Sequence, residues 1–227
     1  MRGIRGAREC QPVSQYPALA VLESLGTIRR YRRCDEIYSQ NDPVSCYYHL
    51  VSGAARRFST QPDGRRQIVD FLLPSDYFGF SSRSEHSFSV EAIVDDTLIA
   101  RYPRAHIDAL IDSDPRIARL LPALTAQEIW RLQQRILVLG RITAQEKIKA
   151  FLLEMAERLS DGRDRIVLPM SRYDVADYLA ISVETVSRAL TLLKQRGTIK
   201  LAGTRRVQLV DHDAFAEAGD DHRRWSA

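Results

Sequence analysis

Residues 168–210 read LPMSRYDVADYLAISVETVSRALTLLKQRGTIKLAGTRRVQLV. This stretch decides the fold, because it contains two short helical patterns followed by two strand-like segments. Ser171, followed three residues later by Asp174, approximates a capping box with Asp in place of the longer Glu or Gln, and predicts where the first helix starts. Ser182 is expected to cap the second helix after a turn at residues 180–182.

The second predicted helix has two contrasting faces. Its apolar residues recur at spacings of three and four, which predicts a buried stripe of Val186, Ala189, Leu190 and Leu193. The opposite stripe can exchange hydrogen bonds across a major groove and comprises Glu184, Ser187, Arg188, Thr191 and Gln195. Arg188 suits a guanine edge and Glu184 a cytosine amino group. A surface ion pair between these two residues, four apart on a helix, is the alternative.

The segment after Gly197 predicts a hairpin. Gly197 is expected to end the helix, and residues 198–201 and 207–210 alternate in character around residues 202–204. Arg205 and Arg206 are expected at the hairpin tip. Two helices, a tight turn and a basic hairpin form the layout of a winged helix–turn–helix, which makes double-stranded DNA the leading candidate partner.

Charge and composition agree with this interpretation. The chain has 227 residues, 44% of them hydrophobic, which is enough for one large or two ordinary globular domains. Its formal net charge is +4, and residues 161–210 contain nine Lys or Arg against five Asp or Glu, which places +4 in this segment alone. Neither a membrane-spanning length of apolar residues nor a secretion signal is evident, so a cytoplasmic protein without a membrane partner is expected.

The sequence contains few candidate catalytic, redox-active or metal-binding residues. Cys10, Cys34 and Cys46 include no C-x-x-C pair, so neither a disulfide framework nor a metal site is indicated. Cys10 lies in a segment expected to be mobile and is a candidate reactive thiol, whereas Cys34 and Cys46 are expected to be small packing residues. No Ser/His/Asp set, paired carboxylates or glycine-rich phosphate loop stands out. We therefore expect neither a cofactor nor an enzymatic activity.

The first half of the chain has a different pattern. From about Thr27 to Tyr102, short runs rich in Ile, Val, Tyr and Phe, such as residues 47–51 and 67–73, alternate with turn residues. Asp63–Gly64 suits a tight hairpin. Strands separated by regularly spaced turns predict a small antiparallel barrel.

Helices are predicted between the two halves. Asp114–Pro115 starts a short amphipathic segment, and a second pattern runs from about Pro122 to Arg141. Its heptad seam requires a partner helix and consists of Thr125, Ile129, Leu132, Ile136 and Leu139. The alternative to a homodimer is a helix that packs only on its own barrel, with Leu124, Trp130 and Leu137 on the packed flank. A capping box at residues 143–146 opens another helix through Leu159, which makes residues 140–142 the joint between two domains.

In this order, the barrel, long helix, joint and winged helix resemble the CRP/FNR superfamily of bacterial transcription regulators from about Leu22 to Phe215. In the barrel the resemblance rests on Gly53, Asp63–Gly64–Arg65, Ile68 and Pro74–Ser75–Asp76–Tyr77–Phe78–Gly79, with Ser75 where the family usually has Gly. In the second helix, Glu184–Thr185–Val186–Ser187–Arg188 matches the E..SR motif of the FNR and FixK branch.

The resemblance implies an α+β fold with a defined order of parts. A cyclic-nucleotide-binding-like β-roll, a jelly-roll barrel, is expected over residues 22–114, a dimerisation helix over 115–141 and a winged helix–turn–helix over 142–215. Residues 1–21 and 216–227 are expected to be flexible.

The resemblance also assigns residue roles. Base reading falls to Val183, Glu184, Ser187 and Arg188, and contacts with the DNA backbone to Ser171, Arg172, Ser182, Thr185, Thr191, Arg205 and Arg206. The implied site is a TTGA…TCAA palindrome read by a homodimer with its reading helices about one DNA turn, roughly 34 Å, apart. RNA polymerase is the implied further partner, and the branch implies activation.

The barrel lacks the residues that sense ligands elsewhere in the superfamily. In the cAMP branch a Glu follows the barrel Gly and an Arg precedes a Ser, whereas here Phe80 follows Gly79 and Phe88 precedes Ser89. An apolar ring cannot neutralise a phosphate, so cyclic nucleotide binding is not expected, although Arg83 lies nearby.

Other sensor chemistry is also not indicated. The iron–sulfur cluster of the FNR sensors requires four cysteines, three of them closely spaced, and isolated histidines such as His49, His86 and His106 are seldom haem ligands. The resemblance is therefore to the FixK type, an effector-independent activator in oxygen-limited or nitrogen-fixation gene control. The alternatives are a ligand- or redox-gated regulator of the same superfamily and, outside this class, a cyclic-nucleotide-binding module that regulates a partner protein.

Overall fold

The computed structural model describes residues 25–81, 83–159 and 165–210. Two four-stranded antiparallel sheets form the predicted barrel, with strand orders β1-β8-β3-β6 and β2-β7-β4-β5. The strands are β1 (Thr27–Tyr31), β2 (Glu36–Tyr38), β3 (Cys46–Ser52), β4 (Ala55–Thr60), β5 (Arg66–Leu72), β6 (Tyr77–Phe78), β7 (Ser89–Ala92) and β8 (Thr97–Pro103). Tyr48, Leu50, Phe78 and Ile99 are buried in the apolar cluster between the sheets. The predicted barrel is confirmed.

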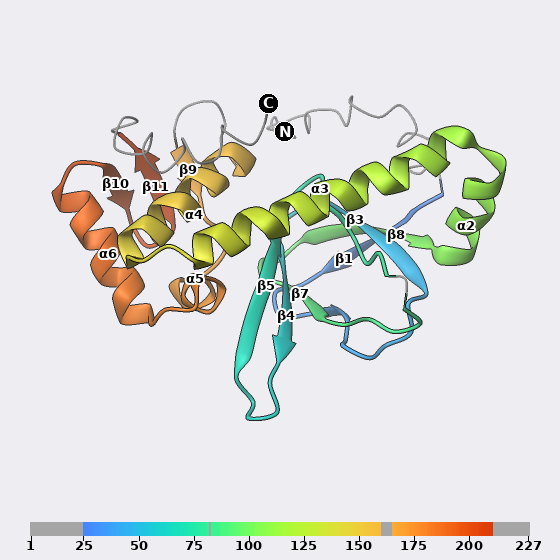
Figure 1. Ribbon diagram of the computed structural model, residues 1–227, viewed down its shortest axis with the longest axis horizontal. Helices are drawn as coiled ribbons and strands as arrows, with labels where there is room; N and C mark the ends of the chain where they lie inside the picture. Colours follow the sequence, from blue (N-terminus) through green and yellow to red (C-terminus); the bar gives the residue numbers. More distant parts are fainter. Residues whose placement is uncertain (1–24, 82, 160–164, 211–227) are drawn as a thin grey trace, which may run out of the picture.

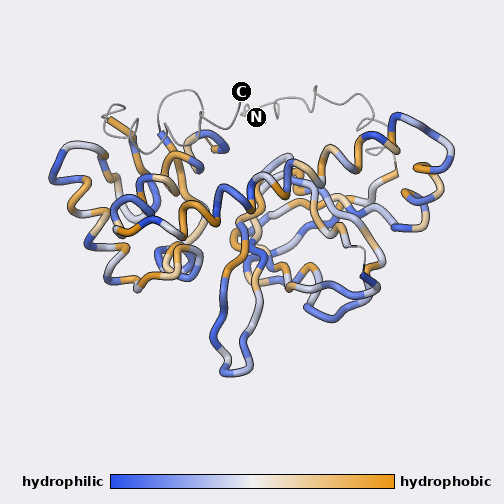
Figure 2. The backbone as a smooth tube through the Cα atoms, in the orientation of Figure 1, coloured by the Kyte–Doolittle hydropathy of each residue, from blue (hydrophilic) through white to orange (hydrophobic). Residues whose placement is uncertain are grey.

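The β4–β5 hairpin extends well beyond the rest of the barrel (Figure 1). Its predicted turn is present, with Gly64 at φ +81° and a hydrogen bond from the Gln61 N–H to the Arg65 carbonyl. The hairpin is hydrophilic at its tip and more hydrophobic where β5 approaches the helices (Figure 2). This polarity indicates that the base of the hairpin is a packing surface.

A single long helix connects the two halves of the molecule. After α2 (Arg104–Ser113), Asp114 caps α3 (Pro115–Leu139), which runs along the barrel toward the C-terminal elements (Figure 1). The prediction of a separate short segment before Pro122 is wrong. Proline removes one backbone donor from the helix, but Leu120 and Leu124 on either side of Pro122 are buried in the same apolar cluster, which holds the helix together.

The C-terminal part has the predicted helix–turn–helix. The capping box of Thr143 and Glu146 starts α4 (Ala144–Leu159), as expected. Ser171 and Asp174 form the predicted capping box of α5 (Arg172–Leu179). After a turn, Ser182 caps α6 (Val183–Gln195) and accepts a hydrogen bond from the Thr185 N–H.

The wing has three strands, in the order β10-β11-β9, rather than the two predicted. Strand β9 (Arg165–Val167) pairs with β11 (Arg206–Leu209), which also pairs with β10 (Ile199–Ala202). Arg206 is therefore not at the tip, because it faces Ala202 as the first residue of β11. Arg205 lies in the turn together with Gly203 and Thr204, as predicted, and its carbonyl accepts a hydrogen bond from the Leu168 N–H.

The largest apolar cluster extends from the barrel into the helix–turn–helix. Ile68 and Phe71 of β5 share it with Phe151 of α4 and Tyr178 of α5. The rings of Phe71 and Tyr178 lie 5.0 Å apart. The two halves are thus joined by buried side chains as well as by the chain itself.

Some sequence predictions lie outside the described residues. These are the flexible segments at 1–21 and 216–227, the reactivity of Cys10 and the ends of the two proposed domains at residues 22–24 and 211–215. Within the described ranges, no helix is long and apolar enough to cross a membrane.

Candidate DNA-reading site

The recognition face is the side of α6 that points away from the core. Val186, Ala189, Leu190 and Leu193 are all buried, as predicted. Glu184, Arg188 and Thr191 are exposed and Ser187 is half-buried. Because residues three and four apart share one side of a helix, these four side chains lie along a single polar stripe.

Glu184 and Arg188 are not engaged with each other. No ion pair joins either side chain to a charged group among the described residues. The pKa of Glu184 is lowered, because its carboxylate accepts hydrogen bonds from its own N–H and from Ser182 at the helix N-terminus, with a further contribution from Arg188. The predicted readers thus present to solvent an ionised acceptor and a guanidinium that has no ion-pair partner in the described part of the chain.

Ser187 is held by a residue from the preceding helix. Nη1 of Arg172, the first residue of α5, donates to the Ser187 hydroxyl at 3.2 Å. One turn further along α6, the Thr191 hydroxyl donates to the Ser187 carbonyl at 2.8 Å. The structure therefore brings together Arg172 and Ser187, for which the sequence implied separate roles.

Several other predicted contact residues also have structural tasks. Val183 is half-buried and packs against the apolar core. Ser171 and Ser182 act as helix caps, and Thr185 shares a 3.0 Å hydroxyl contact with Ser182. Arg205 is half-buried and Arg206 is exposed. No hydrogen bond between the described residues links the wing arginines to α6.

The start of α4 lies beside the recognition helix, which the sequence did not indicate. Thr143, Ala144 and Gln145 line a shallow hollow of about 260 Å³ together with Thr185 and Arg188. The Gln145 side chain accepts a hydrogen bond from Arg196 at the end of α6. The capping box of α4 could be recognised in the sequence, but no sequence pattern indicated that it lies next to α6.

The β4–β5 hairpin holds α5 through charged groups that sequence reasoning missed. Arg56 of β4 contacts Asp174 Oδ1 at 2.5 Å, and the two side chains are only 13% and 6% exposed. Arg66 of β5 contacts Asp174 at 3.3 Å and Asp177 at 3.4 Å. Burial alone would raise the pKa of Asp174, but hydrogen bonds from Ser171 and Arg56 keep it below its usual value. The Asp174 carboxylate, which caps α5, therefore also forms ion pairs with the barrel.

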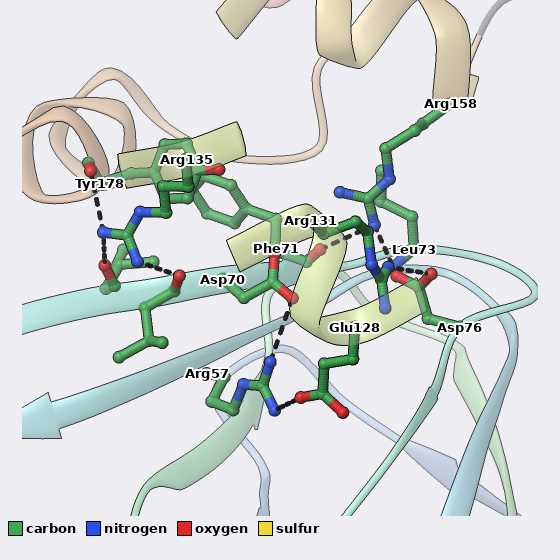
Figure 3. A network of polar contacts seen from close by, with 12 residues as sticks. Arg57, Asp70, Phe71, Leu73, Asp76, Glu128, Arg131, Arg135, Arg158 and Tyr178 are labelled. Atoms are coloured by element: carbon green, nitrogen blue, oxygen red, sulfur yellow. Dashed lines mark hydrogen bonds and ion pairs between the residues drawn. The ribbon is translucent and has the colours of Figure 1, made fainter. Parts of the chain in front are cut away.

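A second set of arginines ties α3 and α4 to the barrel (Figure 3). Arg135 of α3 donates to the Ile68 carbonyl at 2.5 Å and to the Tyr178 carbonyl at 3.1 Å, so it joins β5 to α5. Arg131 of α3 and Arg158 of α4 converge on Asp76 at 2.5 and 2.6 Å. Each of these guanidiniums connects elements that are far apart in the sequence.

The barrel cavity does not suit a cyclic nucleotide. It has a volume of about 210 Å³, and both Phe80 and Phe88 line it, as the sequence predicted. Arg57 is its cation among the described lining residues, but Arg57 is already paired with Asp70 and Glu128 (Figure 3). A phosphate would have to displace these carboxylates, and burying it without a cation is costly.

The remaining candidate ligands do not converge. His49 stacks on Tyr77 at 4.2 Å, and burial lowers the pKa of His49 to about 4. His86 stacks on Tyr38 at 3.7 Å. No cluster of possible metal ligands occurs among the described residues. The expectation that Cys34 is a packing residue is wrong, because it is exposed in a turn with φ +70°.

Known proteins share this arrangement of barrel, long helix and helix–turn–helix. The model of the Crp-like helix-turn-helix domain matches residues 146–218, and that of the cyclic nucleotide-binding domain matches residues 28–114. The nitrogen fixation regulation protein FixK of Azorhizobium caulinodans is 39% identical over 218 residues, which cover 94% of this chain and 85% of that protein. The chain belongs to the FixK branch of the CRP/FNR family.

Two further FixK proteins support this assignment. FixK of Rhizobium meliloti is 41% identical over 188 residues, or 83% of this chain and 85% of that protein. The solved structure of FixK2 from Bradyrhizobium japonicum superposes with a TM-score of 0.81 at 39% identity, covering 85% of this chain and 96% of that one. This member of the FixK branch is a DNA-binding transcription regulator and not an enzyme.

Proposed function

We propose that the chain acts as a homodimeric transcription activator that binds a TTGA…TCAA palindrome without a small-molecule effector. The exposed polar stripe of α6 carries this proposal, since neither Glu184 nor Arg188 forms an ion pair with a described residue and Ser187 lies between them in the sequence. Arg188 suits bidentate contact with a guanine and Glu184 suits a cytosine amino group. Val183 adds an apolar surface at the start of the stripe. Ser171, Arg172, Ser182, Thr185, Thr191, Arg205 and Arg206 are the proposed contacts with the DNA backbone.

The homodimer is supported by the surface of α3. Within the heptad seam, Ile129 and Ile136 are 51% and 66% exposed, Thr125 is exposed, and Leu132 and Leu139 are half-buried. The competing idea that this helix packs only on its own barrel would leave Ile129 and Ile136 exposed to water. A self-complementary apolar stripe suits a two-fold dimer, and two-fold symmetry suits a palindrome.

Effector independence is supported by the barrel cavity and by the contacts of α5. Phe80, Phe88 and the paired Arg57 leave no obvious place for a cyclic phosphate. The ion pairs of Arg56 and Arg66 connect α5 to the barrel through the protein's own side chains. We further propose that the protein works in the cytoplasm with RNA polymerase, in oxygen-limited or nitrogen-fixation gene control. The names of its FixK relatives support a role in nitrogen fixation.

The direct test is a gel-shift titration of purified protein with a TTGA…TCAA duplex and no added ligand. A matched duplex with the TGTGA half-sites of the cAMP branch serves as the control, and both titrations are repeated with cAMP. We expect binding to the first duplex alone, with the same midpoint in both series. A requirement for cAMP or iron, or preference for the TGTGA duplex, would contradict the proposal.

A further inference from the structure

The hydroxyl of Ser187 makes a contact that its own helix does not supply. In helices, serine and threonine hydroxyls often bond the carbonyl four residues earlier. Thr191 does so with the Ser187 carbonyl. The structure records no such bond from Ser187, and among the described residues its hydroxyl contacts only Arg172 Nη1, at 3.2 Å. Arg172 is therefore the hydrogen-bond partner that the described residues provide for this hydroxyl.

Arg172 is well placed to keep this contact. It is the first residue of α5, directly after the capping Ser171, and its side chain is half-buried. Its Nε is buried and has no hydrogen-bond partner among the described residues. The guanidinium thus lies against the recognition helix rather than extending freely into solvent.

The hydrogen-bonding groups of the two side chains determine which of them is the donor in this contact. A serine hydroxyl has one donor and two acceptor lone pairs, so by itself it can meet either a donor or an acceptor on a base. A guanidinium has only donors. When Arg172 donates to Ser187, one lone pair is occupied and the hydroxyl hydrogen turns away from the positive charge.

We propose that Arg172 is a positioning residue that makes Ser187 a hydrogen-bond donor toward DNA. The base edge facing Ser187 must then offer an acceptor, such as a purine N7, guanine O6 or thymine O4, rather than only an amino group. Arg172 would act on specificity through Ser187, instead of serving only as a contact with the phosphate backbone. This inference rests on the proposed role of Ser187 in reading bases.

The test compares four variants with the wild-type protein by fluorescence anisotropy. The variants are Ser187→Ala, Arg172→Met, Arg172→Lys and the double variant Arg172→Met/Ser187→Ala. Each is titrated with the TTGA…TCAA duplex and with duplexes in which one base pair is changed symmetrically in both half-sites. Circular dichroism verifies folding, and Arg172→Met retains a long unbranched side chain.

Ser187→Ala identifies the base pair that Ser187 reads. We expect Arg172→Met to reduce discrimination at that same base pair by about tenfold, which is typical for loss of a charge-assisted hydrogen bond. Discrimination at the other base pairs should not change. Arg172→Lys should restore part of the discrimination, and Arg172→Met should have no further effect in the Ser187→Ala background.

A different pattern would overturn the inference. If Arg172→Met weakens binding to every duplex equally and lowers the salt slope by about 1, then Arg172 is only a phosphate contact. If Ser187→Ala alters discrimination at no position, the base-reading role in the proposed function fails and the inference fails with it. If the wild-type protein does not select the palindrome, the proposed function itself is wrong.

Discussion

Truncation of Ile136 on α3 should weaken the proposed dimer without unfolding the protomer. Ile136→Ala removes three carbon groups, each contributing roughly 0.8 kcal/mol when buried. Because the residue is 66% exposed in the protomer, about two thirds of this, or about 1.6 kcal/mol, would be lost per copy. A two-fold interface contains both copies, so we expect a loss of about 3 kcal/mol and a roughly 100-fold higher dissociation constant.

Ile28→Ala is the matched control, because Ile28 is 61% exposed on strand β1 of the barrel. Sedimentation equilibrium over a dilution series would give the dimer dissociation constant of each protein. Thermal unfolding of both variants should remain close to that of wild type, as is usual for exposed positions. The reasoning would be refuted if both substitutions changed dimerisation equally, or if the wild-type protein sedimented as a monomer.

Four further predictions concern the reading site, the wing, the barrel core and the contact between the barrel and α5. Arg188→Ala should cost about 1–3 kcal/mol and relax preference at one base pair, whereas Arg205→Ala should weaken all sequences alike and lower the salt slope, both measured by anisotropy. The pKa of His49 is about 4 in the folded protein, below its ordinary value of 6.5. Between these two pH values the unfolded chain binds a proton at His49 that the folded protein does not, so lowering the pH favours unfolding. Urea unfolding should therefore show about 2 kcal/mol less stability at pH 5 than at pH 7.5 from this residue, a loss that His49→Phe removes. A double-mutant cycle of Arg56→Ala and Asp174→Asn should give a coupling of roughly 1–3 kcal/mol in unfolding, and additive effects would show that their contact is not stabilising.

Local signals in the sequence were sufficient for most elements. The capping boxes that begin at Ser171 and Thr143 depend on residues three positions apart, so they can be recognised without any tertiary information. The apolar stripe of α6 follows from helical periodicity in the same way. These features placed the recognition helix and its exposed residues correctly.

Contacts between distant segments could not be predicted in this way. Strand β9 has only three residues and is defined by pairing with β11, about forty residues later, so its own sequence has little strand signal. Arg56 and Asp174 are 118 positions apart. In the sequence, the first was an ordinary strand residue and the second only a helix cap. Likewise, Arg172 had no sequence feature that directs it toward Ser187.

The ion pairs that Arg56 and Arg66 form with α5 bear on two separate properties of DNA recognition. In the proposed dimer, the base sequence of each half-site would depend on the exposed stripe of α6, whereas the distance between half-sites would depend on how the barrel holds each helix–turn–helix. In such a dimer the barrel would set the separation of the two reading helices through its ion pairs with α5, a role that requires no bound small molecule.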